Sequence, residues 1–210
     1  MPRQLPTAAM RPQRIPANEY QRVRWRNGAG WTREILQSAS RGVAGDDPAL
    51  AWDWRLSIAE IEHATDFSRF PGVERELVLL RGNGLLLRFD DGQEHVLQPP
   101  HGRCQFRGEG VLTGEPVDGP VHAFNLMWRR EAVSARLWHR PLVGPMLVFV
   151  DPGSCWAAYL VAGEARIAGD AAVPPLAGGD TAVLTAGEGR ARYLIEGGGE
   201  LLLVRVEPSA

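Results

Sequence analysis

Leu77-Val78-Leu79-Leu80-Arg81-Gly82-Asn83-Gly84-Leu85-Leu86-Leu87 is the stretch of sequence that decides the fold. Two apolar runs flank an Asn-Gly pair, which is typical of two strands joined by a tight hairpin. Asp91-Gly92 indicates a further turn, and residues 52–58 alternate apolar and polar side chains with the period of a half-buried strand. Because no long segment has a helical period, the sequence predicts an all-β protein.

The same order of features occurs twice along the chain. A glycine-containing turn, a proline pair with a glycine, and a closing apolar strand follow one another in each half, at 79–85, 99–102 and 123–127 and again at 160–166, 174–178 and 201–204. This is the order of a cupin barrel, so the sequence predicts two tandem cupin-type double-stranded β-helix barrels, a bicupin. We expect a disordered leader over 1–12, a first barrel with a ligand pocket over 13–135, and a mostly structural second barrel over 136–210. Met1 and Met10 are both candidate start residues.

Composition limits the classes of partner. The 210 residues carry a net charge of −2, which gives no electrostatic reason to expect nucleic-acid binding. There is no apolar run of the roughly 20 residues that a membrane helix needs, and no apolar core of a secretion signal, so we expect a cytoplasmic protein without membrane contact. All 23 basic residues are arginine, which excludes lysine Schiff-base chemistry.

The metal-ligand positions of a catalytic cupin hold other residues in this chain. Counting back seven residues from Gly82 places Arg75 in the position of the ligand glutamate, and Gln105 occupies the position of the later histidine. In the second half the glutamate position is Trp156, and no histidine follows His139. We therefore expect neither a metal nor another cofactor.

Polar residues interrupt the apolar strands of the first half and suggest a pocket. Arg75 and Gln105 stand at positions that point into a cupin barrel, and Asn125 interrupts an apolar strand. Arg55 and Ser57 share one face of their strand, which faces either this pocket or solvent. Arginine and amide side chains hold carboxylates through charge-assisted hydrogen bonds, so the sequence predicts a small-carboxylate site.

Six motifs are specific when taken together. They are Trp25-Arg26-Asn27-Gly28-Ala29-Gly30-Trp31-Thr32-Arg33-Glu34-Ile35 and the stretches 54–59, 67–75, 79–84, 106–108 and 124–127. On these motifs the chain resembles the HutD/Ves family of bicupin proteins. The resemblance implies a metal-free regulator of histidine utilisation whose ligand is a small carboxylate such as urocanate or formylglutamate. By motif position it adds Asn27, Thr32, Glu34 and Phe70 to the candidate ligand-binding residues Arg55, Ser57, Arg75 and Asn125.

One departure from the family pattern and two other functions remain open. The family usually has an acidic residue where this chain has Ala123, which puts the choice of ligand in doubt. A metal-independent isomerase or lyase would use Glu34 or His122 as a base. A structural interaction module, including a homodimer, would instead expose a large apolar patch.

Overall fold

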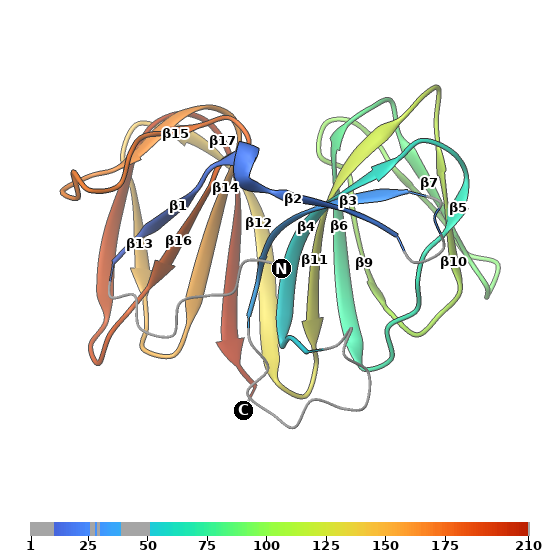
Figure 1. Cartoon of the computed structure of the whole chain (residues 1–210), viewed down its shortest axis with the longest axis horizontal. Helices are drawn as coiled ribbons and strands as arrows, with labels where there is room; N and C mark the ends of the chain where they lie inside the picture. The colour runs from blue at the N-terminus through green and yellow to red at the C-terminus, as the bar shows by residue number, and fades with distance from the viewer. Residues whose placement is uncertain (1–10, 26–27, 29, 39–50, 210) are drawn as a thin grey trace. The chain divides into compact units, whose positions relative to one another are not determined.

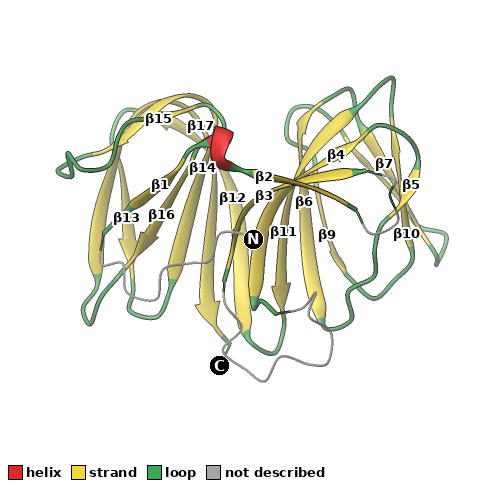
Figure 2. Ribbon diagram, viewed as in Figure 1, coloured by secondary structure: helices red, strands yellow, loops and turns green. Residues whose placement is uncertain are grey.

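The computed structural model describes residues 11–25, 28, 30–38 and 51–209, and in this part the chain is almost entirely β (Figures 1 and 2). The prediction of an all-β fold is confirmed. One short 3-10 helix, η1 (Ala17–Glu19), is the sole helix in the described ranges, and no helix there is long and apolar enough to cross a membrane. The described chain divides into a first unit, residues 21–132, and a second unit, residues 11–20 with 133–209.

The first unit consists of a six-stranded and a four-stranded antiparallel sheet. The larger sheet has the order β2-β3-β4-β11-β6-β9, and the smaller has the order β5-β10-β7-β8. The strands are β2 (Gln21–Arg24), β3 (Trp31–Gln37), β4 (Trp54–Ile61), β5 (Thr65–Asp66), β6 (Val73–Arg81), β7 (Leu85–Phe89), β8 (Glu94–Leu97), β9 (Arg103–Arg107), β10 (Leu112–Pro116) and β11 (Val121–Arg129).

The centre of the larger sheet is buried on both faces. Strand β11 lies between β4 and β6, and its Asn125 pairs with Ser57 on one side and Leu77 on the other. The expected half-buried alternation over 52–58 is therefore wrong, because β4 is an interior strand and even Ser57 is fully buried. The apolar core of this unit includes Leu77 and Leu79 from β6 and Leu85 from β7.

The segment Gly82-Asn83-Gly84 joins the two sheets of the first unit and does not form the predicted hairpin. Strand β6 pairs with β9 and β11, whereas β7 pairs with β8 and β10. Asn83 lacks the positive φ that a two-residue type I′ turn needs at this position, whereas Gly82 and Gly84 have φ of 110° and 153°. A Cβ on Gly82 would lie 2.5 Å from Val121 Cγ1, so the chain needs glycine to turn between the sheets.

The second unit is one seven-stranded sheet that folds over on itself. Its elements are β1 (Gln13–Ile15), η1, β12 (Val133–Val143), β13 (Met146–Val150), β14 (Cys155–Ile167), β15 (Leu176–Ala177), β16 (Thr181–Thr185) and β17 (Ala191–Pro208). Strands β12 and β13 follow one another along β17, which pairs with β14 on its other edge. The sheet bends at glycines: a Cβ on Gly163 or Gly199 would lie 2.0 Å from a carbonyl oxygen of the neighbouring strand.

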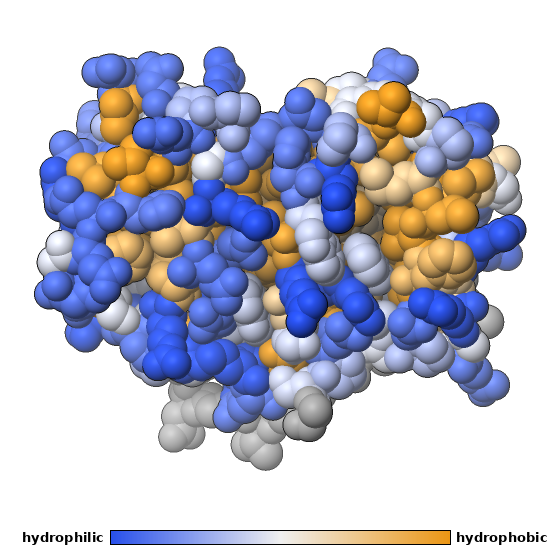
Figure 3. Space-filling model, turned by 180° about the vertical axis from the view of Figure 1, so that it is seen from behind, coloured by the Kyte–Doolittle hydropathy of each residue, from blue (hydrophilic) through white to orange (hydrophobic). Residues whose placement is uncertain are grey.

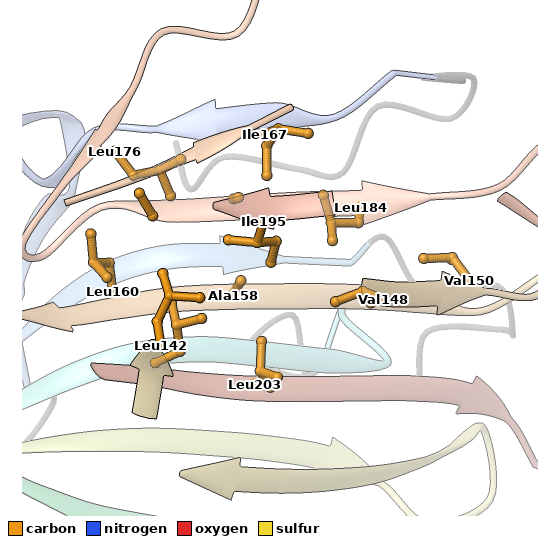
Figure 4. Packing of buried hydrophobic residues seen from close by; sticks show 13 residues of the cluster. Leu142, Val148, Val150, Ala158, Leu160, Ile167, Leu176, Leu184, Ile195 and Leu203 are labelled. Atoms are coloured by element: carbon orange, nitrogen blue, oxygen red, sulfur yellow. The ribbon is translucent and has the colours of Figure 1, made fainter. Parts of the chain in front are cut away.

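This bend encloses the second apolar core. Side chains from both arms of the folded sheet, among them Val148 from β13, Leu160 from β14 and Leu203 from β17, pack into one cluster (Figure 4). Trp138 and Trp156 are partly buried against this cluster.

The N-terminal residues 13–20 pack with the second unit, although we expected them in the first barrel. Strand β1 pairs with β16, and the buried carboxylate of Asp180 accepts hydrogen bonds from Arg14 Nε and the Ala17 amide, both at 2.8 Å. Tyr20 Oη donates to the Gly179 carbonyl oxygen at 2.6 Å. These polar contacts are long-range in sequence, so local sequence patterns carry no trace of them.

Candidate functional site

A cavity of about 440 Å³ lies in the first unit, and we call it the first cavity. Its volume falls within the range of small-molecule sites, and its lining combines apolar side chains with a few polar ones. The lining residues are Gln21, Val23, Arg24, Trp25, Thr32, Glu34, Gln37, Ala51, Trp52, Arg55, Ala59, Phe67, Ser68, Phe70, Arg75, Asn125 and Met127.

Arg75 is the most unusual residue of the first cavity. Its side chain points to the interior because β6 alternates, placing Arg75 on the same face as the core residues Leu77 and Leu79. The residue is only 4% exposed, and no carboxylate pairs with it among the residues that the structure describes. Within the described part of the chain its one hydrogen bond runs from Nη1 to the Ser68 carbonyl oxygen at a long 3.5 Å, and Nε is buried without a partner there.

Three aromatic rings partly compensate the charge of Arg75. The guanidinium carbon lies 5.0 Å from the ring centre of Phe67, 5.7 Å from that of Phe70 and 5.2 Å from that of Phe106. Such cation–π contacts are worth about 0.5–2 kcal/mol each, less than the several kcal/mol that desolvation of an ion costs. Burial, followed by the positive charge of Arg55, lowers the pKa of the Arg75 guanidinium to about 9. Arg75 is therefore still a cation at neutral pH.

Arg55 and Glu34 form an ion pair in the wall of the cavity. Arg55 Nη2 donates to Glu34 Oε1 at 2.5 Å, and their side chains are 17% and 13% exposed. Burial lowers the pKa of Arg55, and the Glu34 carboxylate opposes that shift. Because Glu34 pairs with Arg55, no carboxylate among the described residues balances the positive charge of Arg75.

Asn125 and Ser57 add uncommitted polar groups next to this cation. The residues form a cross-strand pair between β11 and β4, and they are 7% and 0% exposed. Asn125 Oδ1 and Ser57 Oγ are both buried and have no hydrogen-bond partner among the described residues, and the same holds for Arg55 Nε. Each unmade bond of a buried polar group costs about 1–3 kcal/mol. The cavity thus concentrates polar groups that the described protein atoms leave unsatisfied.

Apolar and aromatic groups complete the wall. Trp25 Nε1 donates to Thr32 Oγ1 at 2.8 Å, which fixes the indole at the cavity. The rings of Trp52 and Phe70 pack at a centroid distance of 6.4 Å. A ligand in this cavity would therefore contact the charged and amide groups of Arg75 and Asn125 and also the flat aromatic rings of Trp52 and Phe70.

The structure brings most of the predicted site residues together. Thr32, Glu34, Arg55, Phe70, Arg75 and Asn125 line the first cavity, and Ser57 lies beneath it on the same strand face as Arg55 and Ala59. Asn27 falls outside the described residues.

Gln105 does not point into the barrel, contrary to our expectation. On β9 the side chains of Cys104 and Phe106 pack on the apolar core, so alternation turns Gln105 outward. There the amide donates to Glu74 Oε1 at 3.1 Å. Gln105 therefore does not occupy the position of an inward-pointing cupin histidine, because its place in the alternation of β9 is that of an outward-facing residue.

Sequence reasoning missed the apolar lining residues Trp25, Trp52, Phe67 and Met127. The motif stretches contain some of these, but an apolar residue in a β segment has the same pattern whether it lines a core or a cavity. His122 lies outside the lining, and its Nδ1 is 3.3 Å from Arg33 Nη2.

The donor set of the first cavity does not fit the metal centre of a catalytic cupin. Such centres use neutral imidazole and carboxylate ligands. Among the described lining residues the one carboxylate is Glu34, which Arg55 already engages, and Arg75 would repel a divalent cation.

Comparisons with known proteins agree on one family. A family model described as HutD matches residues 17–203. The chain is 35% identical over 125 residues to an uncharacterised 21.2 kDa protein from the hutC 3′ region of Pseudomonas putida; the match covers 60% of this chain and spans 62% of the relative's length. It is 31% identical over 158 residues to protein Ves of Citrobacter koseri, covering 63% of this chain and 76% of that protein.

Solved structures show the same relationship. HutD from Pseudomonas fluorescens SBW25, solved under a formate condition, matches with a TM-score of 0.79 and 26% identity over 95% of this chain and 100% of that one. The pirin YhhW of Escherichia coli in complex with nickel(II) matches with a TM-score of 0.65 at 11% identity, over 95% and 100% of the two chains. The second likeness concerns the fold alone and supports a cupin-like arrangement.

Proposed function

The chain belongs to the HutD family, and from this premise we propose that it is a small-carboxylate-binding protein that regulates histidine utilisation without catalysing a step. The relative from the hutC 3′ region of Pseudomonas putida supports the association with this pathway. The formate condition under which the Pseudomonas fluorescens protein was solved is compatible with a carboxylate ligand.

The single observation that carries the proposal is that Arg75, in the wall of the first cavity, has no carboxylate partner among the residues that the structure describes. A buried cation without a counter-ion is costly, and a protein retains one where a ligand supplies the missing charge. A carboxylate is the natural partner, because its two oxygens match the planar donor fork of a guanidinium.

The rest of the cavity suggests the chemistry of the remaining part of the ligand. Asn125 offers an amide next to Arg75, and Glu34 Oε2, which takes no part in the hydrogen bond from Arg55, offers an acceptor. The rings of Trp52 and Phe70 offer apolar surface. Urocanate combines one carboxylate with an N–H group and a flat conjugated skeleton, so it complements all three features. Formylglutamate has an amide N–H and two carboxylates, one of which would pair with Arg75.

Isothermal titration calorimetry with urocanate, formylglutamate and formate tests the proposal. We expect saturable binding of at least one of these acids to the wild-type protein. The variant Arg75→Gln should weaken it by about one to two orders of magnitude, since a hydrogen bond to a charged group contributes about 1.5–3 kcal/mol.

Arg88→Gln is the matched control. Arg88 belongs to the same unit, but it is exposed and its partners are the surface residues Glu94 and Glu115. It should leave the affinity unchanged. Absence of binding for all three acids at millimolar concentration, or equal affinities of the wild type and Arg75→Gln, would contradict the proposal.

The alternative of a metal-independent enzyme has less support. Glu34 is held by Arg55, and His122 does not line the first cavity, so neither is placed as a free base. We expect proton NMR spectra of urocanate and formylglutamate to remain unchanged during prolonged incubation with the protein.

A further inference from the structure

The two units repeat one arrangement of strands around their interiors. The order β4-β11-β6-β9 in the first unit corresponds to β12-β17-β14-β16 in the second. Gly82 and Gly163 mark the bends after β6 and within β14, and Arg75 and Trp156 each stand seven residues before these glycines. Arg75 and Trp156 are therefore equivalent positions.

The second unit carries a cavity at this equivalent position. The cavity has a volume of about 520 Å³, and we call it the second cavity. Its lining residues are Arg140, Met146, Leu147, Val148, Phe149, Asp151, Trp156, Arg190, Leu203 and Arg205.

A cation is present in both cavities, but on neighbouring strands. In the first unit Arg75 on β6 pairs with Met127 on β11, and both line the first cavity. In the second unit Trp156 on β14 pairs with Arg205 on β17, and both line the second cavity. The cation is thus on β6 in the first unit and on β17, the equivalent of β11, in the second unit, and the apolar side chain is on the other strand of each pair. Both cavities therefore place a guanidinium next to an apolar side chain.

Positive charge exceeds negative charge in the second cavity. Of its three arginines, Arg190 is 3.1 Å from Asp151, and Arg205 is 2.5 Å from Glu207 and 3.7 Å from Asp151. Arg140 is exposed and has no ion-pair partner within the described ranges. Asp151 is the one carboxylate among the described lining residues, and with Glu207 two acids oppose three guanidinium groups, which leaves Arg140 as the cation in excess.

Flat apolar surfaces accompany these charges. Trp156 stacks on Trp138 with ring centroids 5.7 Å apart and an interplanar angle of 17°, and Arg205 lies over the Trp156 ring at 5.9 Å. Trp156 Nε1 is a buried donor without an acceptor in the described ranges. Phe149, 45% exposed, lies beneath Arg190 at 4.9 Å. On the face of the second unit seen in Figure 3, hydrophobic surface likewise lies beside hydrophilic groups.

We propose that the second cavity is a second anion site, selective for a small aromatic carboxylate. The carboxylate binds to Arg140, which has no ion pair within the described ranges, with Arg205 beside it, and the aromatic ring lies against Trp156 and Leu203. Arginine supplies the bidentate contact and aromatic side chains supply the stacking surface. This site is independent of the first cavity, because the two cavities share no lining residue.

Indole N–H signals in proton–nitrogen NMR spectra test the proposal, because each cavity has its own tryptophan reporters. Trp25 and Trp52 line the first cavity and Trp156 lines the second. Benzoate is the probe, and benzamide is its neutral control of the same shape. We expect benzoate to shift the Trp156 signal saturably and benzamide to leave it unmoved.

Two variants on the second cavity and one on the first separate the sites. Arg205→Met places the residue type of Met127 at the equivalent position, and Arg140→Gln changes an exposed side chain without an ion pair. Each should weaken the benzoate effect on Trp156 at least about tenfold. Arg75→Gln should leave that effect unchanged.

Three results at the second cavity itself would overturn the second site, and a fourth concerns a variant of the first cavity. The three are an unmoved Trp156 signal at tens of millimolar benzoate, equal shifts with benzoate and benzamide, and full retention of the effect in Arg140→Gln. Loss of the Trp156 effect in Arg75→Gln would also overturn it, because the sites would then not be independent. The function proposed for the first cavity fails separately, through affinities that Arg75→Gln leaves intact.

Discussion

Replacing Arg75 with methionine should remove ligand binding and at the same time stabilise the free protein. Methionine has a similar length and flexibility, and it suits a site lined by Phe67, Phe70 and Phe106. We expect the cation to serve a ligand and not the fold, which is a common trade-off between stability and function at binding sites.

The magnitude follows from the contacts of Arg75. Desolvation of the ion costs several kcal/mol, while three ring contacts and one long hydrogen bond to Ser68 offset about 2–4 kcal/mol of it. We therefore expect the free energy of unfolding to rise by about 1–2 kcal/mol in Arg75→Met. For a chain of this length the melting temperature should rise by about 2–8 °C.

Thermal unfolding of the dialysed protein, followed by circular dichroism or calorimetry, provides the assay. Arg55→Met is the matched control from the same cavity. It removes a guanidinium that has a partner and leaves the Glu34 carboxylate without its cation. This control should lower the free energy of unfolding by about 1–3 kcal/mol.

Opposite signs for the two variants are the essential result. If Arg75→Met lowers the melting temperature as Arg55→Met does, Arg75 is a structural cation held by its aromatic neighbours. The main reason to expect a ligand in the first cavity would then be lost.

Three further outcomes are expected. Carboxylate affinity should be constant from about pH 6 to pH 8 and should fall as the pH rises through about 9, because deprotonation of Arg75 removes the charge that binds the anion. Titration calorimetry over this pH range measures the affinity. Asn125→Asp should abolish carboxylate binding and raise the melting temperature, since the new carboxylate would neutralise Arg75. The control Asn125→Leu should have a lower melting temperature than Asn125→Asp. Gly163→Ala should lower the free energy of unfolding, measured in urea, by at least about 2 kcal/mol, because Gly163 has a φ of 97° and a Cβ there would lie 2.0 Å from Gly198 O. Gly189→Ala is the control: no described atom lies within 4 Å of a Cβ at Gly189, so the free energy of unfolding should change by less than about 0.5 kcal/mol.

The sequence predicted the fold class because β patterns are periodic and local. Alternation and turn residues predicted strands in both halves, and the turn at Asp91-Gly92 is present between β7 and β8. The predicted hairpin at Gly82-Asn83-Gly84 was wrong, because these glycines form a bend that connects two sheets. The distinction depends on which strands pair with β6 and β7, and pairing partners are distant in sequence.

The candidate site was predictable where an unusual residue interrupts an apolar pattern. Arg75 and Asn125 were recognised in this way, and both line the first cavity. The prediction that Gln105 points into the barrel was wrong, because a shift of one position along a strand reverses the direction of the side chain. Trp52 and Phe67 could not be recognised as cavity residues from the sequence. An apolar residue in a β segment does not indicate whether it packs in a core or lines a cavity, or which distant strand it faces.

The central claim is that a ligand carboxylate pairs with Arg75, and the Nε–H signal of this residue in proton–nitrogen NMR spectra tests it most directly. The signal is identified by its absence from Arg75→Met. During titration with urocanate and with formylglutamate, we predict that it shifts in proportion to saturation by one of these acids and exchanges more slowly with water. Saturation of the protein by either acid with an unchanged Arg75 signal would place the ligand elsewhere and contradict the account.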